Sequence, residues 1–381
     1  MDSKGGFLRD RFQKNIRQYT MLFALVAIWV IFSVLTDGTF VSPRNLSNLF
    51  IQTCSVAVIA IGMTLIIVTG NIDLSVGSVA ALAGAVGAYM QVKLGWSTAP
   101  AVMAALGCGL LIGMWHGFWI AYRAVPAFIV TLASMLIFRG AVLGVTHGAT
   151  IAPLSESFKA IGQDYISPMA SAVVGTVAIF LYIASALRQR AQRVKYGFKV
   201  SEWPMQGVKL LVAAVVIGAF FRILYVNAGV PYAVMLVLVL ALVFHFLANH
   251  TVFGRHLYAI GGNADAAKLS GINIRRRLLQ LYTVFGALTA VGGLVLTARL
   301  NAATTSAGQG MELDVIAAVV IGGTSLMGGE GTILGALIGA LIMASLDNGM
   351  SLMNTNITYQ YVIKGLILLL AVWVDIATRK K

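Results

Sequence analysis

Twelve apolar runs, most of them long enough to cross a membrane, constrain the fold of this chain more than any other feature. A helix needs about 20 apolar residues to cross about 30 Å of hydrocarbon. The sequence therefore predicts an all-α, polytopic membrane bundle of about 10–12 transmembrane helices in one domain over 19–376. The run at 313–325 is too short to span alone. The runs lie at 19–36, 51–69, 74–92, 99–121, 126–144, 169–187, 208–227, 231–248, 278–297, 313–325, 331–347 and 359–376.

The composition excludes a soluble globular enzyme. Hydrophobic residues make up 59% of the chain and charged residues only 10%, against about 25% charged in soluble domains. The net charge of +14 would suit nucleic acid only if the cations clustered on one polar face. They lie between apolar runs instead, so we expect membrane lipid, and no nucleic acid, as a partner. Cys54 and Cys108 lie inside apolar runs, which predicts packing residues and no disulfide or metal site.

The distribution of Lys and Arg predicts the orientation, because cytoplasmic loops retain an excess of these residues. With the N-terminus inside, 20 of the 27 fall on the cytoplasmic side. They lie in a basic leader at 1–18, at Arg123, in the segments 188–209 and 249–277, and in a tail at 377–381. The leader precedes a run without a small-residue cleavage site, so we expect a retained first helix. Both termini are predicted to be cytoplasmic.

A short turn with an aspartate, TGNIDLSVGS at 69–78, separates two apolar runs. An ionised Asp73 at membrane depth is costly, so it should face a cavity, a partner or the interface. In one interpretation Asp73 only caps the next helix, its carboxylate accepting hydrogen bonds from backbone N–H groups. In the other, the turn lines a translocation path, with Asn71, Asp73 and Ser75 as candidates. The two interpretations are compatible.

The polar segment 249–277 is the longest between the late apolar runs. Gly261-Gly262 is expected to break the chain, Asn263 to cap a helix of about two turns, Asp265 to complement its dipole, and Gly271 to follow its end. A solvated loop has no reason to carry so many apolar residues, so exposed apolar side chains here favour docking to another protein. These residues are Val252, Phe253, Leu257, Tyr258, Ile260, Leu269 and Ile272.

The stretch from 299 to 347 is rich in Gly, Ala, Ser and Thr, which lets membrane helices approach closely. Gly335 and Gly339 have the GxxxG spacing. An acidic pair precedes a short apolar run, as Asp73 precedes another, which is a weak indication of two related halves around a path. The candidates for the path in this stretch are Glu312, Asp314, Thr324, Ser325 and Asp347.

The chain offers no recognisable catalytic or metal-binding motif. A Walker A loop needs Gly-Lys-Ser/Thr, and the sequence contains no Gly-Lys dipeptide. The histidines have no HExxH spacing and are expected to be packed or solvated; they are His116, His147, His245, His250 and His256. We therefore expect no catalytic residue, no metal and no cofactor in this chain.

Four segments, in order, resemble the permease subunits of bacterial ABC sugar importers of the ribose/xylose/galactose class. They are AIGMTLIIVTGNIDLSVGS at 60–78, VPAFIVTLASMLIFRG at 125–140, FGRHLYAIGGNADAAKLSGI at 253–272 and ELDVIAAVVIGGTSLMGGEGT at 312–332. The resemblance is strongest to the D-xylose branch, through WHGFWIAYRAVPAFIVTLA from 115, MASLDNGMSLM from 343, KGLILLLAVWVD from 364, and two extra helices flanking 188–209. At Asn71 many relatives have Gly; Asn tolerates unusual backbone angles, so the turn should survive.

This resemblance implies a multi-pass subunit of the bacterial inner membrane that imports a monosaccharide. It implies a second permease subunit, most simply an identical copy, a cytoplasmic ATP-binding subunit that holds ATP and Mg²⁺, and a periplasmic sugar-binding protein. Ribose, arabinose or galactose remain alternative substrates. An ion-coupled secondary transporter is a further alternative. A membrane enzyme is not expected, because this sequence lacks the clustered acidic residues that such an enzyme would need. The implied ATPase-coupling residues are Gly254, Arg255, Gly261, Gly262, Asn263, Asp265, Ala266, Leu269, Ser270, Gly271 and Ile272.

Overall fold

The computed structural model describes residues 20–198, 200 and 202–379, and within that part all the regular elements are helices. Each of the twelve apolar runs falls on a helix. The predicted basic leader and the last two tail residues lie outside the described residues. The helices are Thr20–Leu35, α2 Pro43–Val68, α3 Val76–Val92, α4 Thr98–Gly117, η1 Phe118–Tyr122, α5 Ala127–Thr146, α6 Glu156–Gln163, α7 Pro168–Lys195, α8 Trp203–Asn227, α9 Tyr232–His250, α10 Val252–Gly262, α11 Ala264–Leu269, α12 Ile274–Leu300, α13 Met311–Ile321, α14 Ile333–Leu352 and α15 Ile357–Arg379.

Eight of these helices are long and apolar enough to cross a membrane, and three shorter apolar ones accompany them among the described residues. The remaining apolar run forms α13, whose 11 residues extend over only about 16 Å. It cannot span a bilayer alone, as the sequence predicts. The all-α, polytopic fold is therefore confirmed.

Capping residues explain why several helices extend beyond their apolar runs. Helix α2 begins eight residues before the predicted run, because Ser42 accepts a hydrogen bond from Asn45 N and Pro43 occupies the first turn. Helix α6 was not expected from the sequence: it has only eight residues, and Ser155 caps it. Apolar length alone therefore locates the spans but not their ends.

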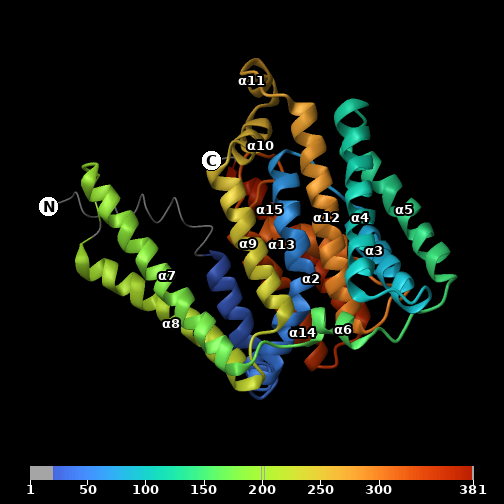
Figure 1. The fold of residues 1–381 in the computed structure, drawn as a ribbon. Helices are drawn as coiled ribbons and strands as arrows, with labels where there is room; N and C mark the ends of the chain where they lie inside the picture. The colour runs from blue at the N-terminus through green and yellow to red at the C-terminus, as the bar shows by residue number, and fades with distance from the viewer. Residues whose placement is uncertain (1–19, 199, 201, 380–381) are drawn as a thin grey trace.

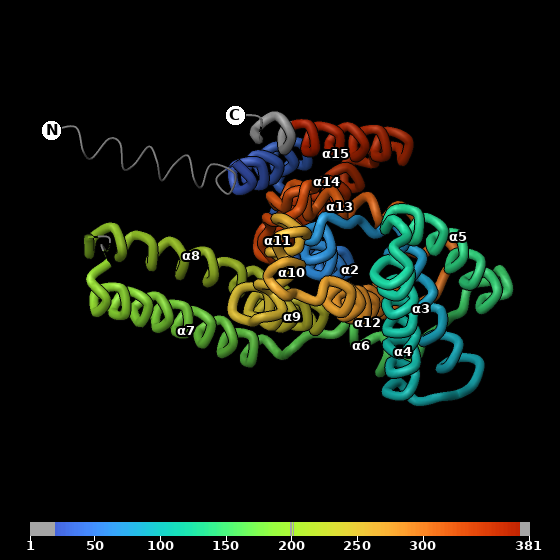
Figure 2. Tube along the Cα trace, turned by 90° about the horizontal axis from the view of Figure 1, so that it is seen from above, coloured from blue at the N-terminus to red at the C-terminus, as the bar shows by residue number. Residues whose placement is uncertain are grey.

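Helices α2 and α12 form the centre of the bundle (Figure 2). Of the most apolar window of α2, 89% is buried, and the value for α12 is 78%, against 11% for α7 and for α8. Close packing against α12 depends on glycine: a side chain at Gly109 of α4 would meet the backbone of Gly286. The surrounding helices therefore cover most of α2 and α12.

Helices α7 and α8 form a hairpin that leaves the bundle at an angle (Figures 1 and 2). The segments that enter and leave the hairpin meet at a narrow base. There Ile166 N donates to Val230 O at 2.8 Å, and Tyr165 pairs with Pro231. Phe220 of α8 packs on Phe50 of α2 with ring centroids 5.0 Å apart. The hairpin is thus attached near its base and free of the bundle beyond it.

Helix α14 packs tightly on α13 through its glycines. A side chain at Gly339 would meet the carbonyl of Ala318, and one at Gly335 would meet that of Gly322. The close packing predicted from the GxxxG spacing is confirmed.

The segment between α12 and α13 turns back into the bundle. Ala303 pairs with Ile151, and a side chain at Gly77 of α3 would meet the carbonyl of Gly308. Arg139 of α5 holds this segment by donating to the carbonyls of Thr305, at 3.3 Å, and Ala307, at 2.8 Å. Irregular backbone at membrane depth is tolerated where protein buries it.

Candidate functional site

Asp73 is almost completely buried, at 1% exposure, at the turn before α3. Its Oδ1 accepts hydrogen bonds from Ser75 N at 2.7 Å and Ser75 Oγ at 2.6 Å. Its Oδ2 lies 3.5 Å from Nδ1 of His116, which is also buried. The hydrogen bond from Ser75 N agrees with the capping interpretation in part, since Ser75, and not Asp73, is the N-cap residue of α3. None of the cavities described below is lined by Asp73. Nothing in the local sequence pattern indicates its pairing with His116, which lies 43 positions away.

The unusual backbone angle at this turn belongs to Gly70, with φ of +77°, and not to Asn71. Asn71 instead donates through its side chain to Thr69 Oγ1 at 3.0 Å. Asn in place of Gly at position 71 is therefore accommodated without an unusual angle there, because the preceding glycine already takes it at no steric cost.

A polar cavity of about 330 Å³ lies between α2, α12, α13 and α14. It brings together two predicted candidates, Asp314 and Asp347. Asn348 beside them is fixed by a reciprocal amide pair with Asn45, at 2.8 and 3.2 Å. The lining residues are Gln52, Ser55, Val56, Leu296, Arg299, Met311, Asp314, Met343, Ala344, Asp347, Asn348 and Ser351.

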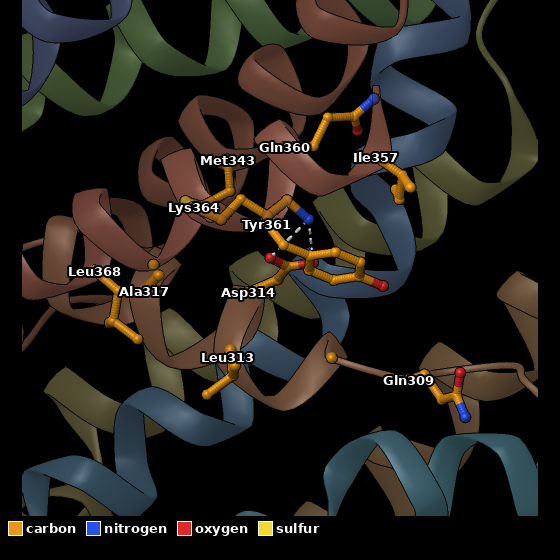
Figure 3. A pocket seen from close by; sticks show the side chains of 12 residues that line it. Gln309, Leu313, Asp314, Ala317, Met343, Ile357, Gln360, Tyr361, Lys364 and Leu368 are labelled. Atoms are coloured by element: carbon orange, nitrogen blue, oxygen red, sulfur yellow. Dashed lines mark hydrogen bonds and ion pairs between the residues drawn. The ribbon is translucent and has the colours of Figure 1, made fainter. Parts of the chain in front are cut away.

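Lys364 of α15 joins the two carboxylates of this cavity. Its Nζ lies 3.0 Å from Asp314 Oδ1 and 2.9 Å from Asp347 Oδ2. Figure 3 shows the Lys364–Asp314 contact in an adjoining cavity of about 150 Å³, beside Gln360 and Tyr361. The cation neutralises part of the charge that two acids would otherwise place among membrane helices.

A third cavity, of about 360 Å³, shares Gln52 and Arg299 with the central one and also touches Gln163 and Tyr165. The central cavity shares Asp314 and Met343 with the cavity at α15. The three therefore form a series from the end of α6 to α15. Sequence reasoning missed Gln52, Ser55, Arg299, Asn348 and Ser351, since nothing in their local patterns distinguishes them.

The other predicted path residues lie elsewhere. Thr324 and Ser325 are buried in the loop between α13 and α14, where Ser325 N donates to Glu330 O at 2.9 Å. The carboxylate of Glu312 lies at Gly77, at the start of α3. The structure thus places Asp314 with Asp347, but keeps both apart from Asp73 and Ser75.

The segment 249–277 forms two short helices, α10 and α11, at the end of the molecule away from α6 (Figure 1). Asn263 Oδ1 accepts from Ala266 N at 2.9 Å, and Gly271 follows the end of α11 with φ of +81°. These caps are as expected. The predicted break at Gly261-Gly262 is confirmed, because the two glycines form the last turn of α10 and the next helix begins only after Asn263. The N-terminus of α10 is capped by Thr251.

Most of the apolar residues of this segment pack against the chain itself. Leu257 is fully buried and Ile260 is 5% exposed, so the expectation that they are available for docking is wrong. A helix that lies on the bundle turns one apolar face inward. Leu269 differs: it is 90% exposed on α11. Around it, Asn263, Asp265, Ala266, Ser270 and Gly271 are also exposed.

Helix α10 is joined to the end of α2 and to the loop between α13 and α14. A side chain at Gly261 would meet the carbonyl of Val68, which also accepts from Gly329 N at 2.8 Å. The Tyr258 hydroxyl donates to Gly331 O at 2.7 Å. Burial raises the pKa of Tyr258, so the phenol keeps its proton and its donor role at neutral pH. A displacement of α10 would therefore act on α2 and on the α13–α14 loop.

The chain is similar to permease components of transport systems over nearly its full length. The family described as branched-chain amino acid transport system / permease component matches residues 45–372. The xylose transport system permease protein XylH of Haemophilus influenzae is 46% identical over 96% of this chain and 98% of its own length. XylH of Escherichia coli is 45% identical over 96% and 93%. The ribose import permease protein RbsC of Bacillus subtilis is 36% identical over 98% and 95%.

No solved structure matches the chain. The membrane-spanning helices, the family match and the coverage of these relatives agree with one another. The chain therefore belongs to this family of transport-system permease components.

Proposed function

We propose that this chain is the membrane-spanning subunit of an ATP-binding-cassette importer that carries D-xylose into the cytoplasm. The observation that carries the proposal is the identity of 46% and 45% to two xylose permeases, each over 96% of the chain. Ribose permeases are less similar, at 37% and 36% identity. In this proposal the chain forms the path and catalyses no reaction.

A partner ATPase subunit would bind ATP and Mg²⁺ and dock on α10 and α11. The 90% exposure of Leu269 on α11 supports this docking, because burial of this side chain in a cleft of the ATPase would remove its apolar surface from water. A periplasmic sugar-binding protein would deliver D-xylose at the opposite end, near α6. A second permease subunit, an identical copy in the simplest assembly, would complete the transporter.

The orientation that suits this assembly places α10, α11 and both termini in the cytoplasm of a bacterium. The basic residues of 249–277 support it, since Lys and Arg are retained on the cytoplasmic side. The arrangement of α15 also supports it, because this last helix ends on the same side as α10 and α11 (Figure 1).

Uptake of radiolabelled D-xylose tests the proposal. Proteoliposomes would contain this chain, its ATPase and the binding protein, with ATP inside or absent. We expect ATP-dependent uptake of D-xylose that ribose in excess does not inhibit. Uptake that continues without the ATPase would indicate a secondary transporter. Uptake of ribose but not D-xylose would overturn the assignment of the sugar.

A further inference from the structure

The central cavity concentrates buried polar atoms that have no partner. In the described part of the chain, nine buried side-chain nitrogen and oxygen atoms lack a hydrogen-bond partner. Three of them, Ser55 Oγ, Arg299 Nε and Asp347 Oδ1, belong to residues that line this one cavity. An unpaired buried polar atom is costly, and such atoms in a native structure call for an explanation.

The three atoms form a complementary set. Arg299 Nε donates, the Asp347 carboxylate oxygen accepts, and the Ser55 hydroxyl does both. Ser55 itself is 2% exposed, so its hydroxyl cannot be satisfied by bulk solvent. A ligand that meets all three must carry donors and acceptors together, which is the chemistry of a hydroxyl group.

The formal charges around the cavity cancel. Asp314 and Asp347 are offset by Lys364, which contacts both, and by Arg299 on the opposite helix. A neutral set of groups favours an uncharged ligand over an ion. The volume of about 330 Å³ is small, at the lower end of the roughly 300–1,000 Å³ usual for small-molecule sites.

We infer that this cavity is a site where a monosaccharide binds transiently during its passage, with its hydroxyls bound by Ser55, Arg299 and Asp347. We call this binding site the station. The inference rests on the proposed sugar-permease function and names the residues that recognise the sugar inside the membrane. The cavity sits in the middle of the series described above, sharing Arg299 with the cavity toward α6 and Asp314 with the one at α15.

Protection of an engineered cysteine would detect the bound sugar. Ser351 lines the cavity and is exposed, so Ser351→Cys, with Cys54 and Cys108 replaced by alanine, leaves one thiol in this chain. The full transporter in nanodiscs would be labelled with a methanethiosulfonate reagent at rising concentrations of D-xylose. We expect D-xylose to slow labelling. L-leucine, an amino acid of similar size, should leave the rate unchanged.

Ser55→Ala and Ser47→Ala form a matched pair of variants. Both serines are buried on α2 and both hydroxyls lack a partner, but Ser47 lines none of the three cavities. Ser55→Ala should weaken protection by D-xylose about 2- to 10-fold, the effect of one neutral hydrogen bond. Ser47→Ala should leave it unchanged.

Three results would overturn the station. They are no protection of the parent thiol by D-xylose, equal protection constants in both serine variants, and protection by L-leucine in place of the sugar. If any one of these results is found while ATP-dependent D-xylose uptake persists, the proposed permease function stands and only the inferred binding site is contradicted. If uptake is absent as well, the proposed function fails with it.

Discussion

At the scale of single residues, Asp73 shows how a buried charge can be held without a cavity. Asp73→Ala removes the acceptor of the two hydrogen bonds that Ser75 N and Ser75 Oγ donate, and it removes the partner of His116. We expect it to lower the free energy of unfolding by about 1–3 kcal/mol. Asp73→Asn keeps an acceptor oxygen and should lose less. Thermal unfolding in detergent measures both.

Glu156→Ala is the control for Asp73, because the side chain of this acid is 91% exposed and its ion pair with Lys159 lies at the surface. It should unfold like the parent. If Asp73→Ala is as stable as Glu156→Ala and imports D-xylose at the parental rate, the cap contributes nothing.

At the scale of elements, α11 is the place to test docking. Burying a Leu side chain stabilises a contact by about 1.5–3 kcal/mol, whereas a carboxylate in the same cleft adds a desolvation cost. Leu269→Asp should therefore insert normally but lose co-purification with the ATPase and all D-xylose uptake, while Leu269→Met should retain both. Recovery of the ATPase with Leu269→Asp at parental yield would contradict the docking.

The contact between α13 and α14 is a second element-scale test. Gly339→Ala places a methyl group against the carbonyl of Ala318, so the helices must separate. We expect a loss of about 1–3 kcal/mol, typical of an overpacked core. Gly140→Ala on α5 is the control, because a side chain there meets nothing within 4 Å. Equal melting temperatures for the two variants would show that α14 can move away from α13 without a loss of stability.

At the scale of the whole molecule, the alternation of helices makes a prediction about sidedness. A cytoplasm-active reporter fused near Lys195, at the end of α7, should be active, and a periplasm-active reporter near Ser157, in α6, should be active. The excess of cations on one side is the physical reason. Activity in the reverse pattern at both positions would contradict this orientation and would place α10 and α11 on the side away from the proposed ATPase.

The spans were predictable from sequence because burial in lipid or protein makes a helix apolar along its whole length. The cavity was not, because its polar residues come from positions as distant as 52 and 351, and each has an ordinary neighbourhood in the chain. Asp314 and Asp347 were recognisable as costly charges, but their shared partner Lys364 was not. In α10, the sequence showed apolar residues without showing which way Leu257 and Ile260 face.

The narrow base of the α7–α8 hairpin has a consequence for how such a chain is put together. Residues 166 and 230 are already hydrogen-bonded neighbours, so the polypeptide enters and leaves the hairpin at nearly the same point. Replacing 167–229 by a few glycines would close that gap without moving α6 or α9. The hairpin therefore connects to the rest of the chain at one joint, and an insertion of another length at this joint would leave the order of the remaining helices unchanged, although Phe50 of α2 would lose its contact with Phe220.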